Sequence, residues 1–103
     1  MTSQEATFFA LMERATIMAN LDGDATLDNG LCGFASIHMP ANTPFAKWAM
    51  RAGIFKKSPV QSGCYYWCRY YGQSYIKKMI WAQTFARVLR DEGINAWTSD
   101  SLD

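Results

Sequence analysis

The segment from residue 63 to residue 72 reads GCYYWCRYYG, with two cysteines, five aromatic residues, one arginine and no acidic residue. Aromatic residues are enriched in strands, where their rings pack on a pleated surface. The segment therefore predicts a β-strand over residues 64–71, which needs partner strands and a covering layer. Alternation along this strand sorts its residues into two faces, one with Cys64, Tyr66, Cys68 and Tyr70, the other with Tyr65, Trp67, Arg69 and Tyr71.

The two faces of this strand differ in how readily they can be buried. Cysteine is among the most buried residue types, whereas arginine is rarely buried without a partner. We therefore expect the face with the two cysteines to join the core. The face around Arg69 either stands open, as a surface that stacks bases or acts as a protein hot spot, or is covered by another segment. Both alternatives remain open on the sequence alone.

Three helices are expected, and each carries a recognisable end signal. The first begins at a T-x-x-E capping box, the second has proline in its first position, and the third ends at a glycine. The expected helices cover residues 3–21, 44–52 and 74–92.

Strands are expected over residues 31–39, 64–71 and 94–99, while residues 54–63 read as a loop. The order is therefore α-β-α-β-α-β in a single domain over residues 1–103. We expect an α+β fold, in which a three-stranded mixed sheet carries helices mainly on one face.

Charge is distributed unevenly along the chain, although the net charge is only +1. Residues 1–40 contain five acidic residues and one arginine, a balance of −4. Residues 41–90 contain nine basic residues, no acidic residue, and 11 of the 15 aromatic residues. A surface that binds an anionic partner is therefore expected in residues 41–90, and the near-neutral total argues against mimicry of DNA by the whole surface.

Catalytic and metal sites are not supported by the residues that could form them. Cys32, His38, Cys64 and Cys68 make up a possible zinc set, but strand geometry separates the last two cysteines by about 13 Å. The same distance excludes a disulfide between them, so we expect buried, inert thiols and no cofactor. His38 is the only histidine, and no hydrolase or phosphate-loop motif accompanies it, so it reads as a structural or surface residue and the protein as non-enzymatic.

The residues expected to contact a partner come from the aromatic strand, the basic loop before it and the polar face of the long helix. On that helix Ile76 and Ile80 lie one turn apart among polar residues, which either marks an interface or is ordinary surface exposure. The full set is Tyr65, Trp67, Arg69, Tyr71, Lys56, Lys57, Ile76, Ile80 and Arg87.

The C-terminal segment FARVLRDEGINAWTSDSLD resembles that of small orphan accessory proteins of tailed bacteriophages. The resemblance rests on Phe85, Ala86, Val88, Leu89, Arg90, Gly93, Ile94, Ala96, Ser99 or Ser101, Leu102 and Asp103. The LCGFA strand at residues 31–35 and the Gly72-Gln73-Ser74 turn extend it. The resemblance implies a phage accessory protein that binds and disables a host machine, including CRISPR and other defence complexes.

The favoured function is accordingly a phage-encoded inhibitor or modulator that binds a host protein or defence ribonucleoprotein complex through its basic and aromatic half. A single-stranded nucleic-acid-binding protein is the alternative, and a small thiol or metal enzyme is a third class. The N-terminus lacks a basic region and a cleavage site, and no run of about 20 apolar residues is present, so we expect no membrane contact and a place in the cytoplasm, that of the host cell if the chain is phage-encoded.

Overall fold

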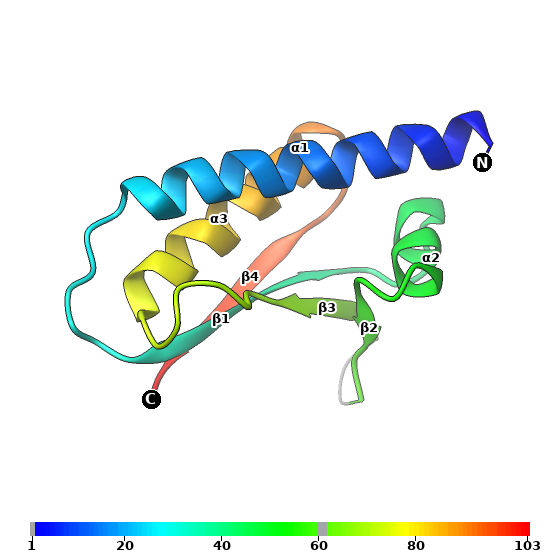
Figure 1. The fold of residues 1–103 in the computed structure, drawn as a ribbon. Helices are drawn as coiled ribbons and strands as arrows, with labels where there is room; N and C mark the ends of the chain where they lie inside the picture. Colours follow the sequence, from blue (N-terminus) through cyan, green and yellow to red (C-terminus); the bar gives the residue numbers. More distant parts are fainter. Residues whose placement is uncertain (1, 60–61) are drawn as a thin grey trace.

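The computed structural model describes residues 2–59 and 62–103. Within them the elements follow one another as α1 (Ser3–Ala25), β1 (Gly33–Met39), α2 (Pro44–Arg51), β2 (Lys56–Lys57), β3 (Cys64–Trp67), α3 (Tyr75–Asp91) and β4 (Trp97–Leu102). This is a small α+β arrangement, as the sequence predicted, with α1 and α3 over one side of a sheet (Figure 1).

The sheet has four strands in the order β2-β3-β1-β4, and every neighbouring pair is antiparallel. The expectation of three strands in a mixed sheet was wrong. Strand β2 is a two-residue pairing of Lys56 with Tyr65 and of Lys57 with Cys64. It lies in the segment expected to be a loop, where two lysines give no strand pattern; residues 60–61 of that segment lie outside the described residues.

Helices α1 and α3 run antiparallel and share the same side of the sheet. Arg14 of α1 forms an ion pair with Glu92, just past the end of α3, while Lys77 near the start of α3 reaches the end of α1. Helix α3 packs against β1 and β4, and α1 packs against α3. No helix of the described residues covers the opposite side of the sheet (Figure 1), which confirms the prediction that helices lie mainly on one face.

The core fills the space between this helix pair and the sheet. Its largest fully buried side chains include Trp81 and Phe85 of α3 and Ile37 and Met39 of β1. From β3, Cys64 is buried, and the ring of Tyr66 packs against both α3 aromatics at 5.8 Å. Cys68 is buried as well, so the prediction is confirmed for the two cysteines, whereas Tyr70 of the same predicted face is 43% exposed.

Helix α1 runs four residues past its expected end at residue 21. The capping box at its start is present, with the Thr2 hydroxyl accepting from the Glu5 amide and the Thr2 amide donating to the Glu5 carboxylate. Its last turn is held by α3: Thr84 donates to the Asp22 carboxylate at 2.6 Å, and Lys77 donates to the Gly23 carbonyl at 2.9 Å. Contacts from α3, which is distant in the sequence, therefore stabilise this last turn of α1, although its own residues favour a loop.

The aromatic segment leaves the sheet earlier than expected, because β3 ends at Trp67. Tyr70 still packs over Trp81 on the helix side, at 5.6 Å between rings. Tyr71 then has a φ of 71° and Gly72 a φ of 54°, two consecutive left-handed residues that turn the chain toward α3. Tyr71 consequently lies against α1 and not on the face of Tyr65 and Trp67, so its predicted position was wrong.

Candidate functional site

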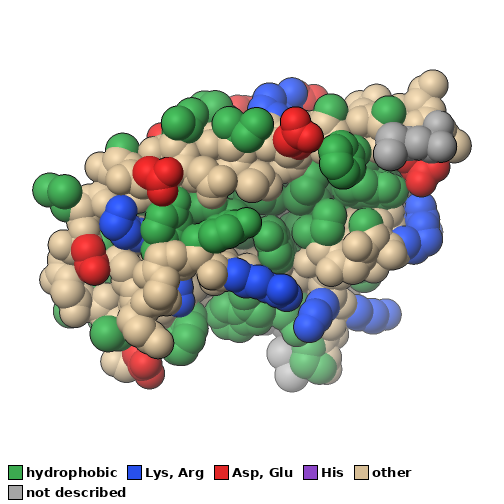
Figure 2. Space-filling model, viewed as in Figure 1, with side chains coloured by type: hydrophobic (Ala, Val, Ile, Leu, Met, Phe, Trp, Pro, Cys, Tyr) green, Lys and Arg blue, Asp and Glu red, His purple; other side chains and the backbone are tan. Residues whose placement is uncertain are grey.

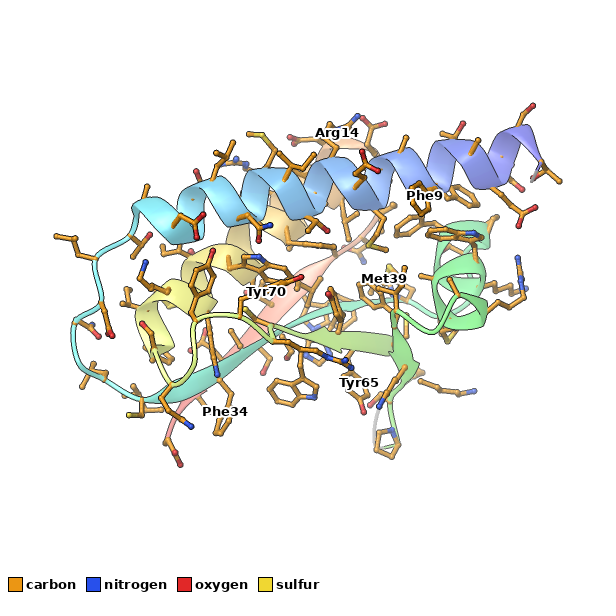
Figure 3. The ribbon with its side chains drawn as sticks, viewed as in Figure 1. Phe9, Arg14, Phe34, Met39, Tyr65 and Tyr70 are labelled. Carbon is orange, nitrogen blue, oxygen red and sulfur yellow. The ribbon has the colours of Figure 1, made fainter. Side chains whose placement is uncertain are left out.

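The face of the sheet without helices, called the open face below, is formed by alternate residues of β1, β3 and β4. In the register of the strands, His38 lies opposite both Tyr65 and Trp97, and Ser36 lies opposite both Trp67 and Ser99. The next β1 residue on this face is Phe34. Figure 3 shows Phe34 and Tyr65 pointing away from the helices, whereas Met39 and Tyr70 point toward them.

Five rings form a continuous row across the open face, called the ring run below. The ring of His38 stacks on that of Trp97 with centroids 5.7 Å apart and planes 15° apart. Tyr65 follows at 6.3 Å from His38, Trp67 at 6.3 Å from Tyr65, and Phe34 at 6.2 Å from Trp67. These spacings lie within the range in which aromatic pairs interact favourably.

The ring run is accessible to a ligand. Trp67 is 47% exposed, Phe34 41% and Trp97 39%, while Tyr65 and His38 are half-buried between them. Single exposed apolar residues are common on protein surfaces, but a contiguous group marks a binding surface. The open face is therefore the strongest candidate site in the described part of the chain.

His38 is fixed in the ring run by Ser36, whose hydroxyl lies 2.8 Å from the His38 Nε2. Partial burial lowers the pKa of His38 below its ordinary value, because it disfavours the charged ring. A serine and a neutral histidine at this distance resemble a nucleophile and its base. Ser36 is only 1% exposed, however, so its hydroxyl is enclosed and the contact orients the histidine ring.

Three cationic side chains border the ring run. Lys56 lies opposite Tyr65 in the register, and together with Arg69 it lines a hollow of about 160 Å³ beside Tyr65 and Trp67. Lys78 of α3 places its ammonium 5.2 Å from the centroid of the Phe34 ring. None of the described strand residues that alternate onto the open face is acidic. Figure 2 shows Lys and Arg side chains around the β2 and α2 end of the molecule.

The structure brings together four of the nine residues expected to contact a partner: Tyr65, Trp67, Arg69 and Lys56. It separates the remaining five from that group. Lys57 pairs with Cys64, so it lies on the opposite side of β2 from Lys56. Tyr71 faces α1, Ile76 lies on α3, and Ile80 and Arg87 line a hollow of about 420 Å³ between the helices with Asp22.

Sequence reasoning missed four members of the site: Phe34, His38 and Trp97 as part of the ring run, and Lys78 at its end. Alternation along residues 33–39 places Phe34 and His38 on the same face of the strand, so the sequence could have predicted that these two rings lie together. The expected strand over residues 94–99 likewise contained Trp97. No local signal identifies Lys78, because its position depends on how α3 packs beside the end of β3.

The three cysteines do not gather into one site. Cys64 and Cys68 are buried in the core, Cys32 is exposed before β1, and all three are free thiols. Burial raises the pKa of the Cys64 thiol to about 11 and also raises that of Cys68. Within residues 2–59 and 62–103, no three His, Cys, Asp or Glu side chains lie close enough to hold one metal ion.

Comparisons with protein-family models, with curated proteins and with solved structures give no match to this chain. In the part of the chain that the structure describes, no helix has the length and apolar character needed to cross a membrane.

Proposed function

We propose that this protein acts by binding, through the open face of its sheet, and that its ligand is single-stranded nucleic acid. The observation that carries the proposal is the ring run of Trp97, His38, Tyr65, Trp67 and Phe34. Every base has a π-face, and stacking of one base on an aromatic side chain is worth about 1–3 kcal/mol. A row of rings across three strands offers several stacking positions, one after another, for successive bases.

Charge at the edge of the ring run supports a nucleic-acid ligand over a neutral one. Lys56, Arg69 and Lys78 border the rings, and the open face carries no acidic residue among the described strands. Phosphate groups bound by these cations release counterions, so affinity falls as salt rises. Three phosphate contacts on a single strand correspond to a slope of about −2 in log K against log salt.

The test is fluorescence polarisation with a labelled mixed-sequence single strand, at several salt concentrations. Trp67→Ala and Trp97→Ala are each expected to weaken binding about tenfold, because each removes one stacking place. Phe9→Ala is the matched control, since Phe9 is an aromatic residue 51% exposed on α1, far from the open face (Figure 3). The proposal fails if the wild type does not bind at low salt, or if all three variants bind equally well.

A second candidate is the binding of a host protein or defence complex by a phage-encoded inhibitor. The hollow of about 300 Å³ on the open face favours it, because a pocket of this kind can hold one anchoring side chain of a partner. Its lining residues are Ser36, His38, Ser58, Pro59, Tyr65, Trp67 and Ser99. This candidate predicts that the chain captures a defined protein from lysate and that nuclease treatment does not release it. The Trp67→Ala variant should lose this protein, and the Phe9→Ala variant should retain it.

A further inference from the structure

Lys78 has a buried aliphatic stem and an ammonium that keeps solvent access and has no anionic partner among the described residues. The residue as a whole is 7% exposed, and its ammonium lies beside the Phe34 ring of the open face although Lys78 belongs to α3. Its backbone N–H donates to the Ser74 carbonyl, but its ammonium makes no hydrogen bond or ion pair with any described residue. Its neighbour Lys77, by contrast, donates to two backbone carbonyls at the end of α1.

A lysine with a buried stem and an ammonium at the surface is a common arrangement, because the stem is apolar and the charge keeps its water. The ammonium of Lys78 has no anionic partner among the described residues, so it is available to bind one. The Phe34 ring helps to hold the ammonium in place, since a cation over a ring face gains about 0.5–1 kcal/mol at an exposed site. The remaining hydrogen-bonding capacity of the ammonium points to a ligand that brings a negative charge.

The space for such a ligand is present beside the ammonium. A hollow of about 490 Å³ is lined by Phe34, Trp67, Cys68 and Lys78. It forms because the paired part of β3 ends where Trp67 meets Ser36, so no β3 residue covers the next position beside Phe34. Its volume lies within the range of about 300–1,000 Å³ typical of small-molecule sites.

We infer that this hollow is a nucleotide subsite, in which the Phe34 and Trp67 rings hold a base and the Lys78 ammonium binds its phosphate. The inference rests on the proposed binding of single strands and identifies where one nucleotide of the strand is anchored. Two ring walls suit the flat apolar faces of a base, and the one cation that lines the hollow suits the anionic group attached to it. The other two cations of the open face, Lys56 and Arg69, are solvent-exposed and guide the rest of the strand.

The experiment combines two titrations of the full chain, one with thymidine 5′-monophosphate against thymidine and one with a labelled oligothymidine. Lys78→Met keeps the length of the side chain and removes the charge. Lys57→Met is the matched control, because it removes the same charge from the side of β2 opposite the open face. Phe34→Leu removes a ring at an exposed position and supplies a second variant if Lys78→Met does not fold.

We expect the monophosphate to bind at least about tenfold more tightly than thymidine, the size of one charge-assisted contact. Lys78→Met should abolish this preference, weaken oligothymidine binding about tenfold and reduce the salt slope by about 0.7. Phe34→Leu should weaken both nucleoside and monophosphate binding, and Lys57→Met should change neither titration.

The outcomes separate this inference from the proposed function. If oligothymidine binds and Lys78→Met behaves like Lys57→Met, the subsite is wrong while single-strand binding stands. If oligothymidine does not bind but the monophosphate binds through Lys78, single-strand binding is wrong and the subsite stands. If neither probe binds the wild type, both are overturned.

Discussion

The hydroxyl of Tyr71 donates a hydrogen bond to the Asp24 carboxylate at 2.9 Å, which fastens the segment after β3 to the last turn of α1. The same hydroxyl lies 3.3 Å from the Asn20 carbonyl, and the ring passes directly over Gly23. Tyr71 occupies a left-handed backbone position that bulky residues avoid. The contacts with α1 stabilise this turn, which directs the chain from the open face into α3.

Replacement of Tyr71 by phenylalanine should lower the free energy of unfolding by about 1–2 kcal/mol, because a hydrogen bond to a charged group is lost. Burial, together with the Asp24 carboxylate, raises the pKa of the Tyr71 phenol, so the hydroxyl keeps its proton at neutral pH. Urea denaturation measures the effect. Tyr65→Phe is the matched control on the open face, and equal stability of the two variants would contradict the prediction.

Gly23→Ala should destabilise the protein although alanine is the better helix former. A Cβ at this position would overlap the Tyr71 ring, so the ring would have to leave its place on α1. In a Tyr71→Ala background the same change should instead stabilise, by up to about 1 kcal/mol, because only the helix propensity of alanine remains. A double-mutant cycle in urea checks this, and additive effects would show that the two residues are not coupled.

The three thiols should differ in reactivity in the native protein. The thiolate is the reactive form, and burial raises the pKa of the Cys64 thiol to about 11 and raises that of Cys68. Cys32 is exposed. Titration with a disulfide reagent at pH 8 should modify one thiol quickly, and the other two only after unfolding. A Cys32→Ser variant should then show no fast reaction, and fast labelling of that variant would refute the assignment.

Stability should fall in mild acid through His38. Its folded-state pKa lies below the ordinary 6.5, because partial burial disfavours the charged ring. Above pH 6.5 neither the folded nor the unfolded chain holds the extra proton. Below it the unfolded chain takes up the proton first, so the free energy of unfolding declines as pH falls. Urea denaturation at pH 7.5 and pH 5.5 should show a smaller decline for His38→Gln than for the wild type, and identical declines would contradict the prediction.

The two adjacent lysines of β2 should contribute unequally to binding. Lys56 pairs with Tyr65 and lies on the open face, whereas Lys57 pairs with Cys64 and lies on the other side. Lys56→Gln should weaken the binding of a labelled single strand and reduce its salt dependence, since one phosphate contact is lost. Lys57→Gln should leave both unchanged. Equal losses in the two variants would mean that the ligand does not follow the open face.

The fold could be predicted from the sequence where the signals are local. A capping box, a proline in a first helical turn and a glycine after a last turn identified the three helices to within a few residues, because a helix end is decided by groups three or four positions apart. The burial of Cys64 and Cys68 followed from residue type and strand alternation. The short pairing at Lys56 and Lys57 could not be predicted, since it exists only because β3 lies beside it.

The residues of the candidate site follow partly from the sequence and partly from the packing of the fold. The sequence alone shows that residues 41–90 hold most of the cations and aromatic rings, and its alternation predicts that Tyr65 and Trp67 share a face of a strand. The packing of the strands adds Phe34, His38 and Trp97 to these rings, and the packing of α3 brings Lys78 to their end. Strand order and register are set by packing between segments as far apart in the chain as residues 33–39 and 97–102, and no pattern within one segment contains that information.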